Sequence, residues 1–213
     1  FTMLSIFLFS PLSLKAQSDV VVINKENFPD NAFRTKIGSA TYDRDGNGVL
    51  DAAEIARIHQ LDLSGSWPNY IADLTGIAFF PDVDSLSVRG NHLSTIDLSH
   101  NTKIRKLYVD NNQLTTIDLS PLTSLVEFSA ADNKLTTIKA VPKLKSLMLD
   151  RNALTSLDLT GNNVLDSLSC RANKLTSLDL KALPDLRYLI CNNNALTSLD
   201  VSGNPKLLLL YCF

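Results

Sequence analysis

Residues 144–154 read Leu-Lys-Ser-Leu-Met-Leu-Asp-Arg-Asn-Ala-Leu, and this frame recurs along most of the chain. When the frame is numbered 1 to 11, positions 1, 4, 6 and 11 are apolar and position 9 is asparagine. The asparagines follow one another at intervals of 21, 21, 19, 21 and 21 residues: Asn91, Asn112, Asn133, Asn152, Asn173 and Asn194. A nearly fixed period of this length predicts a solenoid, in which stacked repeats present an extended binding surface.

Each repeat predicts one short strand followed by a turn. The repeats, called rungs 1 to 7 below, begin at Val83, Ile104, Leu125, Leu144, Leu165, Leu186 and Leu207. Positions 3 to 7 alternate polar and apolar residues, which is the period of a half-buried strand. The asparagine amide offers two donors and an acceptor, so it can satisfy backbone groups left free where the strand turns away. We therefore predict a structural ladder of asparagines rather than a row of ligand sites.

The frame resembles the leucine-rich repeat family over about residues 58–213. The second half of each repeat, such as Leu-Thr-Ser-Leu-Asp-Leu-Thr at 154–160, again has period two. A repeat of 21 residues leaves no room for a long helix, so the convex side is predicted to be extended or a short 3₁₀ turn. The frame is most similar to secreted bacterial repeats of the internalin type, especially cysteine-ladder proteins such as internalin J. This resemblance implies a leucine-rich repeat solenoid with a parallel concave sheet and a helix-poor convex side.

The three cysteines, Cys170, Cys191 and Cys212, occupy position 6 of three successive rungs. Position 6 points into the core, where a free cysteine behaves as a small apolar residue. Because neighbouring rungs lie about 4.8 Å apart, a disulfide between two of them is geometrically conceivable as well. Buried thiols are the favoured interpretation. A row of inward-pointing thiols predicts neither a cysteine nucleophile nor a zinc site, because zinc needs ligands that converge on one point.

A second motif precedes the repeats. Residues 43–54 read Asp-Arg-Asp-Gly-Asn-Gly-Val-Leu-Asp-Ala-Ala-Glu, which matches the 12-residue calcium loop of the EF-hand. The spacing suits Ca²⁺ because this ion takes six to eight oxygen ligands around a tight turn, which Gly48 permits. The predicted ligands are the side chains of Asp43, Asp45, Asn47, Asp51 (directly or through water) and Glu54, and the backbone carbonyl of Val49.

Asp51 and Glu54 alone would also make a capping box for the helix predicted after them. That alternative leaves Asp43, Asp45 and Gly48 unexplained, so calcium is favoured. Residues 27–30 read Asn-Phe-Pro-Asp, and the arrangement resembles secreted bacterial repeat proteins in which this tetrapeptide and a calcium loop precede the repeats. The resemblance implies a small helical, EF-hand-like cap over residues 17–57, stiffened by calcium, because the first edge of a solenoid must be covered. Trp67 is predicted to help shield that edge, in preference to a ligand role.

The ends of the chain carry further predictions. Residues 1–14 are an apolar run that is too short and too broken to span a bilayer. The run ends in Leu-Lys-Ala-Gln, which looks like a signal-peptidase site after Ala16. Residues 1–16 are therefore predicted to be a signal peptide that lacks its basic start, with no cysteine for a lipoprotein anchor. Export to the periplasm, the cell surface or the medium suits a calcium loop. The seventh rung stops at Phe213, before its asparagine, which predicts that more chain follows.

The outward positions of the predicted sheet define the candidate ligand site. A bare scaffold would tolerate small polar residues there, but this chain places aromatics, a methionine and mixed charges on the concave face. Tyr188, Ile190 and Tyr211 would form one apolar patch, which either a partner or further rungs could meet. The predicted ligand-binding residues are Arg89, Tyr108, Asp110, Met148, Asp150, Arg151, Arg171, Tyr188, Ile190, Asn192 and Tyr211.

A stripe of aspartates repeats at one outward position of the second half of the rungs, interrupted by Lys139: Asp97, Asp118, Asp158, Asp179 and Asp200. Like charges at rung spacing repel each other. The favoured interpretation is that these carboxylates accept turn hydrogen bonds from neighbouring Ser and Thr residues. A surface ladder of bound cations is the functional alternative.

Three classes of function remain. The leading hypothesis is an exported, monomeric binding module that recognises a protein or a glycan through its concave face, with Ca²⁺ as its one cofactor. The second is a structural repeat of the cell envelope without a specific ligand. An enzyme is disfavoured because His59, His92 and His100 pair with no plausible nucleophile at a readable spacing. The net charge of −2 provides no basic patch for nucleic acid or an acidic membrane.

Overall fold

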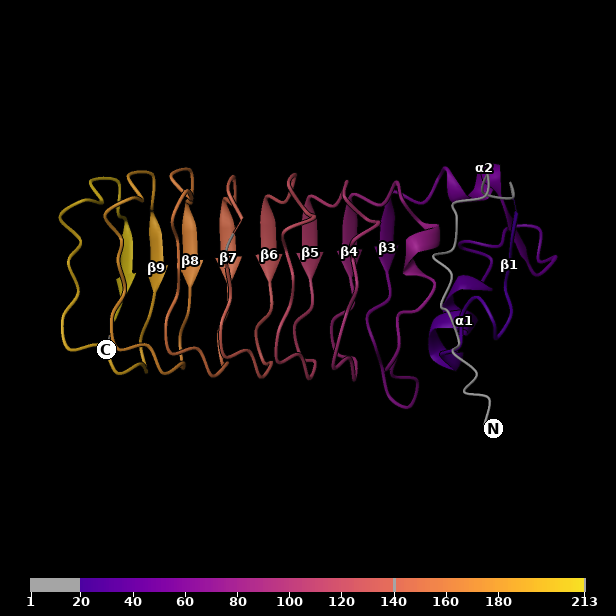
Figure 1. Ribbon diagram of the computed structural model, residues 1–213, viewed down its shortest axis with the longest axis horizontal. Helices are drawn as coiled ribbons and strands as arrows, with labels where there is room; N and C mark the ends of the chain where they lie inside the picture. The colour runs from indigo at the N-terminus through magenta and orange to yellow at the C-terminus, as the bar shows by residue number, and fades with distance from the viewer. Residues whose placement is uncertain (1–19, 140, 213) are drawn as a thin grey trace, which may run out of the picture.

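The computed structural model describes residues 20–139 and 141–212, and the predicted signal peptide lies outside this part of the chain. Eight short parallel strands lie side by side in chain order and form one long sheet (Figure 1). Every strand pairs with its neighbour at the same rung positions, so that Leu86 lies opposite Leu107, and Leu107 opposite Phe128. The strands are β3 (Gln60–Asp62), β4 (Ser85–Ser87), β5 (Lys106–Tyr108), β6 (Glu127–Ser129), β7 (Ser146–Met148), β8 (Ser167–Ser169), β9 (Tyr188–Ile190) and β10 (Leu209–Tyr211). The predicted parallel solenoid is confirmed.

The sheet contains one strand more than the seven predicted rungs. Strand β3 precedes rung 1 and pairs with β4 in parallel, with Leu61 opposite Leu86. Leu61 and Leu63 are buried in line with positions 4 and 6 of the later rungs. The sequence pattern does not reveal this rung 0, because Ser66 stands where the later rungs carry asparagine.

The core is a column of apolar side chains that runs the length of the sheet. In rung 4 the side chains at positions 1, 4, 6 and 11, namely Leu144, Leu147, Leu149 and Leu154, are all fully buried. Full burial of one leucine contributes about 1.5 to 3 kcal/mol. Each rung buries its apolar side chains against the rungs beside it. The core is therefore built by contacts between neighbouring rungs rather than by packing around one central point.

The asparagine ladder is confirmed, and Asn112 shows how it works. Its Nδ2 donates to the carbonyl of Val109 in its own rung at 3.0 Å and to that of Val88 in the preceding rung at 2.9 Å. Its Oδ1 accepts the N–H of Leu93 in the preceding rung at 3.0 Å. The same three bonds recur at Asn91, Asn133, Asn152, Asn173 and Asn194. Each asparagine therefore fastens the turn of one rung to the next.

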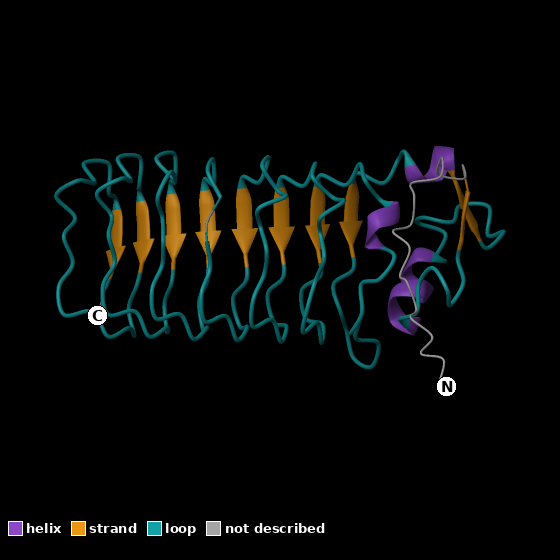
Figure 2. Ribbon diagram, in the orientation of Figure 1, coloured by secondary structure: helices purple, strands orange, loops and turns teal. Residues whose placement is uncertain are grey.

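The convex side is poor in helix, as predicted. Figure 2 shows the helices gathered at the N-terminal end, including the short 3₁₀ helix η1 (Ile77–Phe79) that follows β3. A second column of buried asparagines, which the sequence frame did not single out, donates to backbone carbonyls on this side: Asn101, Asn162 and Asn204. Among the described residues, no helix is both long enough and apolar enough to cross a membrane.

A small helical segment lies at the N-terminal end of the sheet (Figure 1). It comprises α1 (Asn31–Ile37), α2 (Ala52–Ile55) and an antiparallel pair of strands, β1 (Val20–Val22) and β2 (Val49–Asp51). Asp30 begins α1 by accepting the N–H of Phe33 at 2.9 Å, and its second oxygen accepts the N–H of Ala72 at 2.9 Å. Phe28 packs edge-on against Phe33 and against Phe79. These contacts attach the segment to the chain that follows β3.

Trp67 does not shield this edge, contrary to the prediction. Its side chain is 82% exposed in the loop that follows β3, whereas Phe28 and Phe80 are fully buried nearby. The prediction was wrong because a sequence shows which residues are apolar but not which way an inserted loop points.

Candidate functional site

Three carboxylates converge in the loop formed by residues 43–54. One oxygen each of Asp43, Asp45 and Glu54 lies within 4.8 Å of the other two. Asp43 and Glu54 are buried, although carboxylates are rarely buried without a compensating partner. Within the described part of the chain, Oδ1 of Asp43 has no hydrogen-bond partner. A divalent cation could satisfy this oxygen and offset the repulsion among the three carboxylates.

Backbone geometry holds this loop in a tight turn. The N–H of Gly48 donates to Oδ2 of Asp43 at 3.0 Å, and the N–H of Val49 donates to Oδ1 of Asn47 at 2.8 Å. Gly46 and Gly48 have φ values of 68° and 79°, a left-handed conformation that glycine adopts without the usual penalty. Gly48 therefore has the predicted role in the turn, and Gly46 shares it.

The capping box and the carboxylate cluster coexist. Oδ1 of Asp51 accepts the N–H of Glu54 at 2.8 Å, and Oε2 of Glu54 accepts the N–H of Asp51 at 3.1 Å. These reciprocal bonds cap α2, while Glu54 also belongs to the cluster. The side chain of Asp51 is not part of the cluster, so its ligand role stays a prediction, as do those of Asn47 and Val49.

Arg89, Tyr108, Asp110 and Glu127 form a connected group on the concave face. Nε of Arg89 donates to Oδ2 of Asp110 at 2.7 Å, and the Arg89 guanidinium lies 4.1 Å from the centre of the Tyr108 ring. The Tyr108 hydroxyl donates to Oε2 of Glu127 at 2.7 Å. That bond lowers the pKa of Glu127, whereas burial, followed by the same bond, raises the pKa of Tyr108. Sequence reasoning missed Glu127, which stands at position 3 of the next rung and opposite Lys106.

Asp110 and Asp150 are engaged within the sheet. Oδ1 of Asp110 accepts the Ser129 hydroxyl and the N–H of Ala131. Asp150 repeats this arrangement with the Ser169 hydroxyl at 2.5 Å and the N–H of Arg171 at 3.0 Å. The sequence signal for this pair of hydrogen bonds is an aspartate at position 7 followed 19 residues later by a serine. The ligand role of both aspartates stays a prediction.

Three further predicted ligand-binding residues, Arg151, Met148 and Arg171, differ in whether they are paired. Arg151 lies beside the sheet in a two-point ion pair with Asp132, and this pair lowers the pKa of Asp132. Met148 is 44% exposed in the middle of the sheet. The side chain of Arg171 is exposed and forms no ion pair with a described residue.

The register of β9 and β10 creates a contiguous apolar surface on the concave face. It places Tyr188 opposite Leu209 and Ile190 opposite Tyr211. Tyr188, Leu209 and Tyr211 are exposed and Ile190 is half-buried. We call these four residues the tyrosine patch. Asn192, the last predicted residue, follows the patch at position 7.

The convex aspartates accept turn hydrogen bonds, which confirms the favoured interpretation of the stripe at four positions; at the fifth, Asp179, the donor is Lys181 rather than Ser or Thr. Each accepts the N–H two residues ahead at 2.8 to 3.0 Å: Asp97, Asp118, Asp158, Asp179 and Asp200. The bonds from Ser99, Ser120, Thr160 and Ser202 lower the pKa of their aspartates.

These lowered pKa values predict a loss of stability in acid. A carboxyl group whose pKa is lower in the folded state stabilises the fold above its unfolded pKa, near 3.8, and loses that contribution as the pH falls through the folded pKa. We expect the free energy of unfolding, measured with urea, to decline below about pH 4. Asp118→Asn with Asp158→Asn keeps an accepting oxygen, so the double variant should decline less steeply. Glu26→Gln is the control, and equal slopes for the double variant and the unchanged protein would contradict the prediction.

All three cysteines are free thiols, and Cys170 and Cys191 are buried as predicted. Cys212 is exposed, contrary to the prediction, because no described rung packs against the far side of β10. Burial raises the pKa of the Cys170 thiol, and it raises the pKa of Cys191 to about 11. The reactive form of cysteine is the thiolate, so both buried thiols are held in their inert form.

Thiol labelling should separate Cys212 from the other two cysteines. Cys212 is exposed, so we expect one fast-reacting thiol per folded chain with a thiol-specific disulfide reagent, and three thiols in denaturant. Cys212→Ser should remove the fast phase. A second fast thiol in the folded variant would show that the column of buried cysteines is open to solvent.

One histidine does lie beside a hydroxyl group, which sequence spacing did not predict. Nδ1 of His100 is 3.0 Å from Oγ of Ser99 on an exposed convex turn. The Asp97 carboxylate accepts the N–H of Ser99 rather than a hydrogen bond from the imidazole. The group therefore lacks the aspartate-oriented histidine of a catalytic triad.

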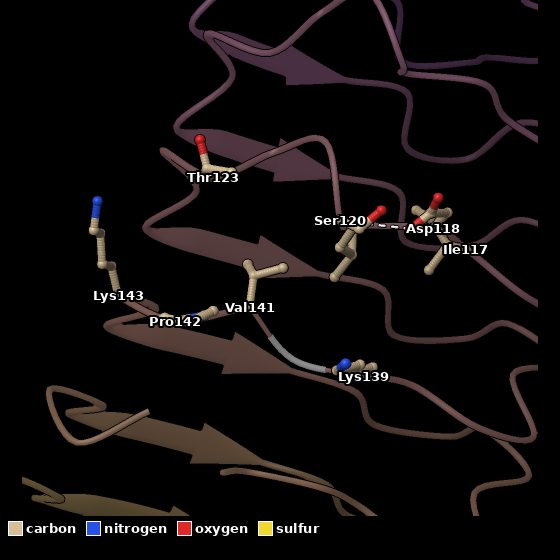
Figure 3. Close-up of a pocket in the computed structure, with 9 residues that line it drawn as sticks. Ile117, Asp118, Ser120, Thr123, Lys139, Val141, Pro142 and Lys143 are labelled. Carbon is tan, nitrogen blue, oxygen red and sulfur yellow. Dashed lines mark hydrogen bonds between the residues drawn. The ribbon is translucent and has the colours of Figure 1, made fainter. Parts of the chain in front are cut away.

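The shortened third rung leaves a hollow on the convex side. Rung 3 has 19 residues, yet β6 keeps its register with β5 and β7, so the shortening falls outside the sheet. The hollow has a volume of about 440 Å³, and its walls include Ile117, Leu119, Val141 and Pro142. Figure 3 shows Val141 and Pro142 facing the turn made by Asp118 and Ser120. None of the predicted ligand-binding residues lines this hollow.

Solved structures with the same architecture are internalins and other leucine-rich repeat proteins. The functional domain of internalin J from Listeria monocytogenes, which includes a cysteine ladder, matches 92% of this chain with 27% identity and a TM-score of 0.56. Internalin C2 from the same organism matches 92% of the chain with 18% identity and a TM-score of 0.64, over 99% of its own length. A leucine-rich repeat protein of Leptospira interrogans matches 67% of the chain with 22% identity and a TM-score of 0.53.

This chain has an internalin-like leucine-rich repeat fold. The matches span about half of the internalin J domain and of the Leptospira protein, 52% and 46% of their lengths. No protein-family model matches the sequence, and no curated protein matches it.

Proposed function

We propose that this chain is an exported binding module that recognises a protein through the concave face of its solenoid. Its internalin-like fold supports this proposal, because such repeats build long surfaces that contact other proteins. The fold alone does not determine a ligand, so the argument depends on the side chains of the face. A structural repeat of the cell envelope without a specific ligand is the alternative.

The tyrosine patch carries the proposal, together with Met148 and Arg171. Outward positions 3 and 5 point away from the sheet rather than along the solenoid axis, so stacking of rungs leaves these side chains uncovered. Aromatic residues, methionine and arginine are the types enriched where proteins meet. An exposed apolar surface of this kind gains stability when a partner covers it.

We further propose that Ca²⁺ stabilises the N-terminal segment as an EF-hand-like cap. The buried, unpartnered Oδ1 of Asp43 and the nearby carboxylates of Asp45 and Glu54 support this part of the proposal. Strand β1 pairs with β2, which is part of the loop, with Val21 opposite the fully buried Leu50. Bound Ca²⁺ would supply charge compensation to the loop, and β1 would hold the loop against the rest of the segment. Export is part of the same proposal, since a weak calcium site suffices outside the cytosol.

The binding proposal is tested with an array of purified extracellular matrix and cell-surface proteins, probed with residues 17–213 in calcium buffer and again with chelator. For any protein that binds, Arg171→Glu should weaken affinity at least about tenfold without lowering the melting temperature. Arg171 is preferred to Arg89 for this test, because reversing Arg89 would also break its ion pair with Asp110.

Lys174→Glu is the matched control. Lys174 is an exposed cation three residues further along the same rung, and it forms no ion pair with a described residue. An equal loss of affinity in both variants would contradict recognition by the concave face. If no protein on the array binds, the structural alternative is favoured. The same holds if substitutions on the concave face leave every measured affinity unchanged.

A further inference from the structure

The loop after β3 is longer than the loop between positions 8 and 11 in each of rungs 1 to 6. The N–H of Gly65 donates to the carbonyl of Arg89, as that of Gly90 does to the carbonyl of Asp110, so these glycines are equivalent. Ile71 donates its N–H to Oδ1 of Asn91, as Leu93 does to Asn112. Residues 66–70 therefore stand where rung 1 has only two residues, and the loop extends beyond its neighbours (Figure 1).

This insertion presents an exposed indole on a closed turn. The N–H of Asn69 donates to the carbonyl of Ser66 at 2.7 Å and closes the tip of the loop. Trp67 lies within that tip and is 82% exposed. Tryptophan is buried to a large extent in most proteins, since its surface contributes strongly to the core. The exposed indole on this closed turn is therefore available for contact with a ligand.

A second aromatic surface joins the end of this loop to rung 1. The rings of Tyr70 and His92 lie 4.4 Å apart, centre to centre, and are inclined by 34°. They border a shallow groove of about 370 Å³ at the edge of the solenoid, which continues past the amides of Asn111 and Gln113 to the Asp132 carboxylate. Apart from the rings of Tyr70 and His92, no aliphatic or aromatic side chain lines the groove.

We propose that this edge binds a neutral oligosaccharide chain. A sugar ring offers one face of C–H groups, which packs against aromatic rings, and a rim of hydroxyl groups, which bind amides and carboxylates. The groove supplies both kinds of partner in sequence, with the Tyr70 and His92 rings at one end and Gln113 and Asp132 further along. Both oxygens of Asp132 also accept from Arg151. Trp67 does not line the groove but stands three positions before Tyr70 in the same loop. The groove lacks the apolar pockets that anchor peptide side chains. The site is separate from the concave face and does not depend on the function proposed there.

The chain contains a single tryptophan, so its fluorescence reports on Trp67 alone. We expect emission typical of a water-exposed indole that is readily quenched by acrylamide. Soluble hexasaccharides of glucose, mannose and N-acetylglucosamine serve as probes, with the protein in calcium buffer. At least one of them should shift the emission to shorter wavelength and protect it from quenching, because the sugar face would displace water from the ring.

Native gels cast with the matching polysaccharides then locate the site. Retardation by a bound polysaccharide should weaken about tenfold in Trp67→Ala and in Tyr70→Ala. Tyr188→Ala is the matched control, because it removes an exposed aromatic ring from the concave face and should leave retardation unchanged. Trp67 is so exposed that its truncation leaves the core intact, and an unchanged melting temperature verifies this for each variant.

Several outcomes would overturn the proposal. These are an emission spectrum that no probe changes, retardation that survives in Trp67→Ala, or an equal loss in Tyr188→Ala. A shift produced by a tryptophan-free apolar peptide but by no saccharide would assign the edge to peptide binding instead. None of these results affects the array test of the concave face, so the two proposals fail separately.

Discussion

Saturating Ca²⁺ should raise the melting temperature of this protein by about 5 to 10 °C when the ion is in hundredfold excess over its Kd. The ion would bind only the folded loop, in which Asp43, Asp45 and Glu54 already bring their oxygens within 4.8 Å of one another. The buried Oδ1 of Asp43 has no partner within the described residues, so binding would remove a cost that the metal-free loop carries. Calorimetry in calcium and in chelator measures the shift.

Glu54→Gln should abolish this shift. Glutamine can occupy the same capping-box position as glutamate, so the variant removes a charged ligand while it retains the cap of α2. Glu26→Gln is the matched control, because Glu26 is an exposed carboxylate outside the loop, and it should melt like the unchanged protein in both buffers. An identical melting curve with and without Ca²⁺ in the unchanged protein would remove calcium from the proposed function.

Asn112→Ala should lower the free energy of unfolding by about 3 to 5 kcal/mol. The Asn112 side chain is buried, and its loss would leave the N–H of Leu93 without a partner. The carbonyls of Val88 and Val109 would each lose one hydrogen bond and keep the one from Asn91 or Asn133. A buried backbone group without a partner costs about 1 to 3 kcal/mol, and each lost hydrogen bond costs about 0.5 to 1.5 kcal/mol. Because the three groups belong to two rungs, the variant weakens the junction between rungs as well as the turn. Urea unfolding monitored by circular dichroism measures the change.

Asn163→Ala is the control for the ladder. Asn163 is exposed, and the structure gives its side chain no hydrogen bond, so its replacement should change stability by less than about 0.5 kcal/mol. If Asn112→Ala were as mild as this control, the asparagine at position 9 would not be structural. The repeat would then need another explanation for carrying asparagine so regularly.

Much of the fold could be read from the sequence because its determinants are local and periodic. Alternation at positions 3 to 7 predicts the strands, and the asparagine at position 9 predicts the ladder. Each strand pairs with the strand of the next rung, and each asparagine bonds to the preceding rung. The repeat period therefore predicts which residues pair. The carboxylate cluster was predictable for the same reason, because Asp43, Asp45 and Glu54 belong to one short loop whose spacing is the motif.

The predictions fell short where the period is interrupted or where a side chain can choose between partners. Rung 0 lacks the asparagine that marks a rung, so only the pairing of β3 with β4 reveals it. The sequence did not predict that the Ser129 hydroxyl and Arg89 engage both oxygens of Asp110, whose ligand role stays a prediction. The shortened third rung gives no indication in the sequence of a hollow, because its depth depends on how the neighbouring rungs pack.

By itself the sequence determined that this chain stacks 21-residue rungs into a parallel sheet, buries Cys170 and Cys191 and brings the carboxylates of Asp43, Asp45 and Glu54 together in one loop. Those features follow from the periodic burial of apolar residues and from ligand spacing within one turn. Only the tertiary structure decided that Trp67 stands in water, that Tyr70 stacks on His92, and that Asp110 is tied into the sheet. The physical reason is that these outcomes depend on the direction of inserted loops and on hydrogen-bond competition between rungs, neither of which a linear pattern encodes.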